Sequence, residues 1–356
     1  MITPRDRILM SLDHEPPDRT PTDGWFHPEV VEKLKDHYQT DDWNIVLGRL
    51  GIEGWAEISP SVRFPKCEQR LHPRPGFDAD VHEDPWGIRF KAGEGGRYQQ
   101  WLSGPLQNCE TADDVARYHF PSPADVIDPV GYADRVATLK REGKFVSGGI
   151  DNPFKRFWHL RGYENALMDY LSNREALEAI YDPLFALYTE ICVHEARAGV
   201  DMIKVVGDVA MQDRIIMGPE VWRKVDKPRF AKLIDACRAV NSRLHFFFHS
   251  DGRLTDLVDD LVEIGFNVIN PIQPECMNPF DVKKRWGRRI TLHGCISIQR
   301  TLPFGSVADV RNEVEGLIRE CGRDGGLVLM PSNVIQPDTP LENIIACYET
   351  ARNFKL

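Results

Sequence analysis

Short apolar runs of strand length recur along the chain, and helical patterns separate most of them. Near-continuous apolar runs are typical of strands that are covered on both faces, as in a parallel sheet. These runs are clearest in the second half of the chain, and the two weakest come first. The eight predicted strands cover residues 19–25, 52–58, 145–150, 202–207, 244–249, 266–270, 290–293 and 327–330.

Helical signals lie between the strands. Ser306 with Asp309 marks one helix start, and the segment Thr339–Glu342 combines a capping residue, a proline and a glutamate at another. Steps of three and four residues predict one apolar helix face, formed by Leu177, Ile180, Leu184, Leu187 and Ile191.

Eight strands with helices between most of them predict an α/β fold, a (β/α)8 barrel that forms a single domain over residues 1–356. A doubly wound sheet is the competing fold, but no G-x-G-x-x-G motif follows any predicted strand. Roughly residues 60–140 break the pattern, being rich in Pro, Gly and Trp (PRPGFDAD, EDPWGIRF, GEGGRY). We interpret this segment as an insertion of short hairpins between the second and third strands.

Charge and composition narrow the class of protein. The chain has 44 Lys+Arg against 54 Asp+Glu, a net charge of −10, which disfavours nonspecific nucleic-acid binding. The longest stretch without these four residues, 325–337, is too short to cross a bilayer, and no secretory signal is visible. Eight scattered cysteines without a C-x-x-C pair are typical of reduced thiols. We therefore expect a cytoplasmic globular protein, most simply an enzyme.

In a barrel of this type the active site lies at the carboxyl ends of the strands. His249 and Asp251, in the segment HSDG, could share a metal or orient one another; the plainer alternative is a packed histidine and a helix cap. Asp208 ends VVGD and could act as a general acid or base, or cap a loop, with Gln212 as a weaker companion. Glu53 is a further catalytic candidate, although it could be a solvated carboxylate.

The remaining strand ends supply candidates for binding. The amides of Asn333 and Gln336 could bind a carboxylate or amide group of a ligand. Cys295 could be a thiolate ligand or nucleophile, but a buried inert cysteine is commoner, and His293 is expected to be structural. Three further strand-end residues are expected to bind substrate or cofactor: Trp25, His27 and Asn270.

Five segments together resemble the uroporphyrinogen decarboxylase superfamily, and the resemblance covers essentially the whole chain. It is most specific in the second half. The segments are TPRDRILMSLDHEPPDRTP, GVDMIKVVGDVAMQ, FFFHSDGRLTDLVDDLVEIGFNVINPIQP, LHGCISIQRTLPFGS and GGLVLMPSNVIQPDTPLENI. The resemblance implies a (β/α)8 barrel with its cleft at the strand carboxyl ends, and either porphyrinogen decarboxylation or zinc- and corrinoid-dependent methyl transfer.

Two departures from the decarboxylase pattern favour the methyltransferase branch. Decarboxylases of the superfamily carry an arginine-rich segment after the first strand, but here that place reads DGWFHPEV. Without those guanidinium groups the carboxylates of a porphyrinogen would be poorly paired. Decarboxylases also place an aspartate after the second strand, where this chain offers only Glu53 or Glu57.

The methyltransferase branch binds zinc through a His-x-Cys pair and a later cysteine. The matching positions here are His249, Asp251 and Asn333, a harder ligand set that is weaker for zinc. The resemblance implies a corrinoid carried by a partner protein, a small methylated substrate and a homodimer. The alternatives are decarboxylation of uroporphyrinogen or another polycarboxylate, and a non-catalytic barrel that binds a tetrapyrrole or corrinoid.

Overall fold

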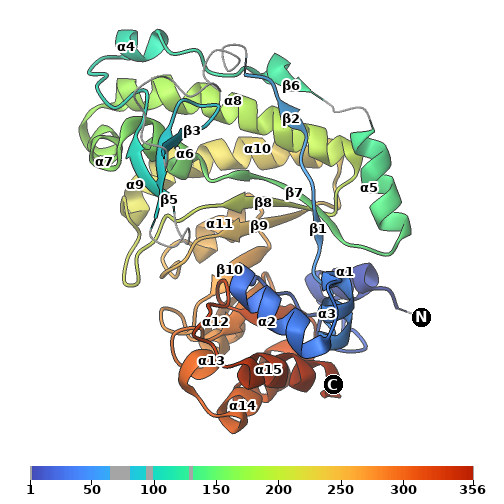
Figure 1. Cartoon of the computed structure of the whole chain (residues 1–356). Coiled ribbons are helices and arrows are strands. Elements are labelled where there is room, and N and C mark those ends of the chain that lie inside the picture. The colour runs from blue at the N-terminus through green and yellow to red at the C-terminus, as the bar shows by residue number, and fades with distance from the viewer. Residues whose placement is uncertain (1, 65–80, 94–98, 128–130, 356) are drawn as a thin grey trace.

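A parallel sheet of seven strands forms the centre of the molecule (Figure 1). The computed structural model describes residues 2–64, 81–93, 99–127 and 131–355. The strands follow one another in chain order around the sheet, and every neighbouring pair is parallel. They are β1 (Ala56–Glu57), β7 (Val146–Asp151), β8 (Met202–Val206), β9 (His245–His249), β10 (Val268–Ile272), β11 (Thr291–Ile296) and β12 (Leu327–Pro331).

The segment 21–26 joins the two edges of this sheet. Leu329 in β12 exchanges backbone hydrogen bonds with Pro21 and Asp23, and Thr22 accepts hydrogen bonds from the backbone of Glu53 and Gly54. The predicted α/β barrel is therefore confirmed. Its expected first strand is present only as isolated bridges, because Pro21 lacks the amide hydrogen that a regular ladder needs.

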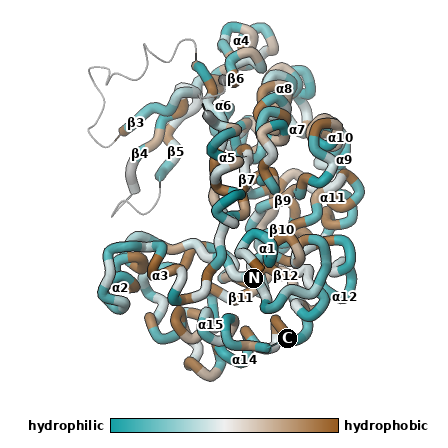
Figure 2. The backbone as a smooth tube through the Cα atoms, turned by 90° about the vertical axis from the view of Figure 1, so that its right-hand side faces the viewer, coloured by the Kyte–Doolittle hydropathy of each residue, from teal (hydrophilic) through white to brown (hydrophobic). Residues whose placement is uncertain are grey.

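The predicted hairpin-rich insertion lies between β1 and β7 (Figures 1 and 2). Strands β3, β4 and β5 form a small antiparallel sheet, and β2 pairs with β6. The predicted turn segment at residues 73–80, and most of that at 93–98, lie outside the described residues. The insertion contains β2 (Ser61–Val62), β3 (Val81–Glu83), β4 (Arg89–Ala92), β5 (Gln99–Ser103), α4 (Ala112–Ala116), a 3-10 turn (Pro123–Asp125), β6 (Val126–Ile127) and α5 (Tyr132–Arg141).

Helices cover the outside of the sheet. None of them, over the described residues, is long and apolar enough to cross a membrane. Outside the insertion the helices are α1 (Pro4–Leu12), α2 (Pro28–Tyr38), α3 (Trp43–Leu50), α6 (Pro153–Arg161), α7 (Tyr163–Ser172), α8 (Arg174–Ala198), α9 (Pro219–Val225), α10 (Lys227–Val240), α11 (Val258–Ile264), α12 (Pro279–Trp286), α13 (Thr301–Phe304), α14 (Val307–Leu317), a π-helical turn (Ile318–Gly322) and α15 (Leu341–Asn353).

Two of the three helix predictions hold. The stripe from Leu177 to Ile191 is buried on α8, and Ser306 caps α14 in a reciprocal box with Asp309. The third prediction, Thr339 as the capping residue of the last helix, is wrong. The residue before α15 is Pro340, which offers no side-chain acceptor, and the helix begins at Leu341.

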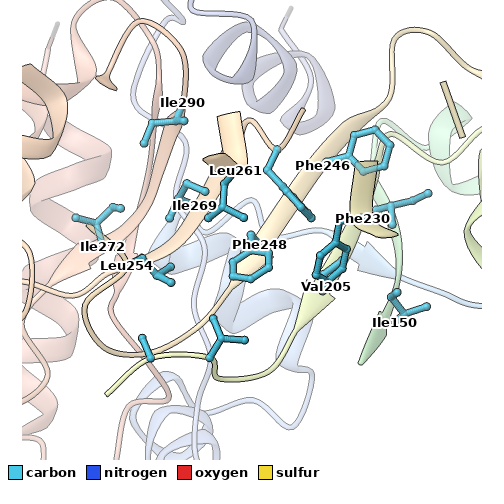
Figure 3. Close-up of a cluster of buried hydrophobic side chains, with 14 of the residues drawn as sticks. Ile150, Val205, Phe230, Phe246, Phe248, Leu254, Leu261, Ile269, Ile272 and Ile290 are labelled. Carbon is cyan, nitrogen blue, oxygen red and sulfur yellow. The ribbon is translucent and has the colours of Figure 1, made fainter. Parts of the chain in front are cut away.

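Strand β9 shows how the core is divided between the inside and the outside of the barrel. Phe246 and Phe248 face outward and belong to the buried cluster drawn in Figure 3. Their ring centroids lie 6.4 and 5.0 Å from that of Phe266. Phe247 faces inward, 5.3 Å from the ring of His293. Successive side chains of a strand point to opposite faces, so the same alternation places His249 inside the barrel. Burying each phenyl ring contributes about 1.5–3 kcal/mol to the free energy of unfolding.

Helix α1 closes the amino-terminal end of the barrel. Ile8 and Leu12 join a buried cluster with inward residues of the strands, among them Phe247. Beside this plug, the buried Glu53 pairs with Arg7 at 2.9 Å and with Arg19, and it accepts a hydrogen bond from the Thr22 amide at 2.9 Å. Glu53 therefore links α1 to the segment that completes the barrel, at the end opposite the strand carboxyl ends.

Replacing Glu53 tests this structural role. Glu53→Gln keeps the shape but removes the buried charge that pairs with Arg7 and with the partly buried Arg19, so we expect the free energy of unfolding to fall by about 3 kcal/mol in urea denaturation. The exposed Glu142→Gln serves as the control and should change stability by less than about 0.5 kcal/mol. Unchanged stability together with lost activity would instead restore a catalytic role for Glu53.

Asp226 gives the fold a pH dependence. It is fully buried and accepts hydrogen bonds from the hydroxyls of Tyr170 at 3.1 Å and Tyr181 at 3.2 Å. Burial raises the pKa of Asp226 to about 7, against the lowering effect of the two hydroxyls. The folded state therefore holds a proton that the unfolded chain releases near pH 4, and stability falls as pH rises from about 4 to about 7.

Asp226→Asn removes this ionisation. The free energy of unfolding of the wild type should fall relative to that of the variant as pH rises. We expect the difference between the two proteins to change by about 2–4 kcal/mol, in favour of the variant, between about pH 5 and about pH 8, measured by urea unfolding at both values. Asp182→Asn, an exposed carboxylate on α8, is the matched control. A difference between variant and wild type that is the same at both pH values would contradict the assignment.

Candidate functional site

Two loops at the carboxyl ends of β8 and β9 bring three acceptor groups together. Asp208 follows β8, His249 ends β9, and Asp251 lies two residues further on; one ligand atom of each lies within 4.8 Å of the other two. The Asp251 amide donates a hydrogen bond to Asp208 Oδ1 at 2.8 Å. The loops approach closely because Gly252, at φ 91°, has no side chain: a Cβ there would lie 2.4 Å from the Met211 carbonyl oxygen.

His249 presents one ring nitrogen to the two carboxylates. Its Nδ1 lies 2.5 Å from Asn270 Oδ1, and its Nε2 lies 3.9 Å from Asp208 Oδ1. An amide oxygen only accepts hydrogen bonds, so Nδ1 carries a hydrogen, and in the neutral imidazole Nε2 then keeps its lone pair. With a neutral His249, the side chains of His249, Asp208 and an ionised Asp251 therefore direct only acceptor atoms at one another.

Asp251 is the most constrained member of this cluster. Its Oδ2 accepts a hydrogen bond from Asn333 Nδ2 at 2.6 Å, while its Oδ1 is shut off from solvent and has no hydrogen-bond partner among the described residues. Burial raises the pKa of Asp251 and the Asp208 charge adds to this, whereas His249 and Asn333 lower it. A buried carboxylate oxygen without a donor indicates a place for a proton or a cation.

The three positions expected to bind a metal are only partly brought together. Asn333 turns its amide nitrogen toward Asp251, and its oxygen accepts a hydrogen bond from the Val334 amide at 2.6 Å. It therefore orients Asp251 with its nitrogen, while its oxygen is engaged with the Val334 backbone. Asp208, expected from the sequence as an acid or base, supplies the third ligand-capable group instead.

A pocket of about 500 Å³ opens beside Asp251. Four carboxamides line it, together with neutral and apolar side chains such as Phe26 and Ile298, and none of its described lining residues is Lys or Arg. The predicted binding residues His27, Asn333 and Gln336 all line it. The four carboxamides are those of Gln273, Gln299, Asn333 and Gln336.

The other predicted binding residues lie in varied places. The ring of Trp25 is 5.7 Å from that of His249, so it borders the cluster. His27 also caps α2 by accepting a hydrogen bond from the Glu29 amide at 3.2 Å. Gln212 is exposed and is not among the residues that line the pocket. Asn270 is fully buried beneath His249 and contacts its ring, so the structure does not expose it to the pocket.

The remaining candidates do not reach the pocket. Glu53 lies in the ion-pair network beside α1. Cys295 is fully buried in the core, and burial raises the pKa of its thiol, which disfavours a thiolate. His293 is fully buried, and burial lowers its pKa against the opposing effect of Asp23.

Two residues near the site escaped the sequence analysis. Lys204 is buried inside the barrel, paired with Glu57 and 6.0 Å from the centroid of the Trp25 ring. Its signal was a single charged residue within the apolar run MIKVVG. Gln273, which lines the pocket, was missed because β10 continues to Ile272, two residues beyond the predicted strand end.

Comparison with known proteins identifies the family. The family described as uroporphyrinogen decarboxylase (URO-D) matches residues 103–354. No curated protein matches the chain. Among solved structures, the chain is similar to a methyltransferase from Methanosarcina mazei, with a TM-score of 0.68 and 21% identity over 99% of each chain.

Two glycosidases show weaker likeness. A GH27 β-L-arabinopyranosidase from Geobacillus stearothermophilus has a TM-score of 0.37 and 12% identity over 93% of this chain and 77% of that one. A GH10 xylanase from Gloeophyllum trabeum has a TM-score of 0.38 and 9% identity over 63% and 81%. Both likenesses are weak, whereas that to the methyltransferase shows a shared fold. The family match, in contrast, covers most of the chain and confirms the resemblance seen in the sequence: the chain belongs to the uroporphyrinogen decarboxylase family.

Proposed function

We propose that this chain is a methyltransferase that moves a methyl group between a small substrate in the pocket and a corrinoid carried by a partner protein. The observation that carries the proposal is the convergence of Asp208, His249 and Asp251 beside the pocket. The full-length likeness to a protein named as a methyltransferase supports it, as does the family's known methyltransferase branch.

The cluster has the donor atoms that a catalytic divalent cation needs. Three protein ligands with an open fourth position are typical of catalytic zinc sites, and nitrogen–oxygen sets also suit other divalent metals. The lone pair of His249 Nε2 and the unpartnered Asp251 Oδ1 fit this role, and Asp208 completes the set. The chemistry that a cation supplies at such a site is polarisation of the heteroatom that carries the methyl group, which makes it a better leaving group.

The residues of the chain would bind and orient the substrate. A pocket of about 500 Å³ has the size of a small-molecule site. Its carboxamides can donate and accept hydrogen bonds around a polar, uncharged molecule. Asp208 has about half of its side chain exposed (53%), so it is the member of the cluster most open to solvent.

The pocket argues against decarboxylation of a polycarboxylate. A porphyrinogen carries several carboxylates, and such groups are held in proteins by bidentate arginines or by lysines. None of the described residues that line the pocket is Arg or Lys. The nearby cation Lys204 is buried and already paired with Glu57.

Metal content and methyl transfer together test the proposal. We expect about one divalent metal ion per purified chain by elemental analysis, lost in His249→Ala. With cob(I)alamin and a panel of methyl donors, we expect methylcobalamin to form, at a rate at least about 100-fold lower in His249→Ala. His82→Ala, in the exposed part of β3, is the matched control and should keep both properties.

Two results would overturn the proposal. One is a folded His249→Ala protein that retains its metal and its rate. The other is release of CO2 from uroporphyrinogen, read as coproporphyrin fluorescence after oxidation, with no methylcobalamin from any donor. The second result would place the protein in the decarboxylase branch of its family.

A further inference from the structure

A line of buried polar side chains runs from His249 into the barrel. Asn270, on β10, contacts His249 Nδ1 through its oxygen at 2.5 Å and His293 Nδ1 through its nitrogen at 2.7 Å. His293, on β11, in turn lies with Nε2 3.4 Å from Asp23 Oδ2. All four side chains are at least nine-tenths buried, with exposed fractions of 10% or less. The line therefore crosses the barrel interior from β9 through β10 and β11 to the segment 21–26, which lies beyond β12, and it is almost entirely shielded from bulk water.

The chemistry of these groups fixes the direction of every hydrogen in the line. The amide oxygen of Asn270 can only accept, so His249 donates from Nδ1. The amide nitrogen can only donate, so His293 Nδ1 accepts, and a neutral His293 must then carry its hydrogen on Nε2, facing the carboxylate of Asp23. Each group thus donates toward Asp23, whose negative charge favours this direction over the reverse one.

The direction of the line decides what His249 presents to the pocket. With the hydrogen on Nδ1, Nε2 faces Asp208 as a lone pair at 3.9 Å, which suits a shared cation. With the hydrogen on Nε2, His249 would donate to Asp208 and the two would form an ordinary pair with no need of a cation. The tautomer therefore separates a metal site from an acid–base pair.

We propose that Asn270 and His293 are positioning residues that hold His249 as its Nδ1–H tautomer, so that Nε2 is free to bind a divalent cation with Asp208 and Asp251. This inference rests on the cation site of the proposed function, but the tautomer itself is a property of the metal-free chain. Hydrogen bonds of this kind fix both the rotation and the tautomer of metal-binding histidines, and their loss costs about 10–100-fold in metal affinity.

The tautomer can be read directly by NMR of the full-length, metal-free protein with 15N-labelled histidine. The spectrum of His249→Gln identifies the signals of His249. We expect a protonated Nδ1 and an unprotonated Nε2 in the wild type, and a shift toward protonated Nε2 in Asn270→Leu, which removes both amide groups. A wild-type His249 protonated at Nε2 would overturn the proposal.

Metal affinity provides the second readout, with Zn2+ in competition titrations and Co2+ as a spectroscopic probe. We expect Asn270→Leu to weaken Zn2+ binding by about 10–100-fold and to change the visible spectrum of bound Co2+. Asn270→Asp keeps an oxygen that accepts from His249, so it should stay within a few-fold of the wild type. A folded Asn270→Leu protein with wild-type Zn2+ affinity would contradict the positioning role.

Asn267 offers a matched control at the opposite end of the same two strands. Its amide nitrogen lies 2.8 Å from His245 Nδ1, so Asn267→Leu removes a similar contact far from the cluster. We expect it to lower stability without changing Zn2+ affinity; an equal loss of affinity would show that general destabilisation is the cause. If the wild type binds no divalent metal while His249 is protonated at Nδ1, the cation site of the proposed function fails and the positioning of the tautomer stands.

Discussion

The period-two alternation of side chains in a closed parallel barrel is the constraint on which the rest of this structure depends. Strand β9 reads HFFFH, and its five side chains are all buried. Phe246 and Phe248 must face the helices, and Phe247 must face the interior. Shifting this pattern by one residue would exchange the two faces. The packing of the phenyl rings thus also fixes the inward direction of His249.

The parallel order of the strands decides where along the barrel the inward-facing polar side chains gather. Because all strands run in the same direction, their carboxyl ends meet at one mouth, and the loops after β8 and β9 become neighbours. Helix α1 and the Glu53 network close the opposite end with apolar side chains and ion pairs. The carboxyl ends of the strands are left open, and the cluster of Asp208, His249 and Asp251 lies there beside the pocket.

The sequence predicts most of this fold because apolar strand runs and helix patterns are both local features of the chain. Strands β7 to β12 are apolar runs that are covered on both faces, and their predicted ends differ from the observed ones by no more than three residues. The first segment of the barrel was harder, because Pro21 allows only isolated bridges. Its place is decided by backbone hydrogen bonds to residues distant in the chain, Leu329 and Glu53, which no local pattern contains.

The site was predictable to the extent that it lies at strand ends. Asp208, His249 and Asp251 were found in this way, and the structure brings them together. The prediction for Glu53 was wrong, because Glu53 lies before the short strand β1 and not after it. It therefore lies at the amino-terminal end of the barrel and not at the carboxyl end. The role of Asn333 depends on the direction of its amide, and that is set by Asp251 and the Val334 backbone. Sequence spacing holds no information on such a contact.

The distribution of charge inside the barrel sets the cluster of Asp208, His249 and Asp251 apart from the other carboxylates. Glu57 is paired with Lys204, and Asp23 faces the donating nitrogen of His293. Among the described residues, Asp208 and Asp251 have no Lys or Arg partner, and the histidine between them offers a lone pair.

Two negative charges and three acceptor atoms within a few ångströms repel one another, and burial strengthens that repulsion. Protonation of Asp251 would relieve half of it, and the raised pKa of Asp251 shows that tendency. A divalent cation would neutralise both carboxylates and also use the lone pair, which a proton on Asp251 cannot do. In a neutral His249, the direction of the hydrogen bonds from His249 through Asn270 to His293 leaves Nε2 with the lone pair that the proposed cation would use.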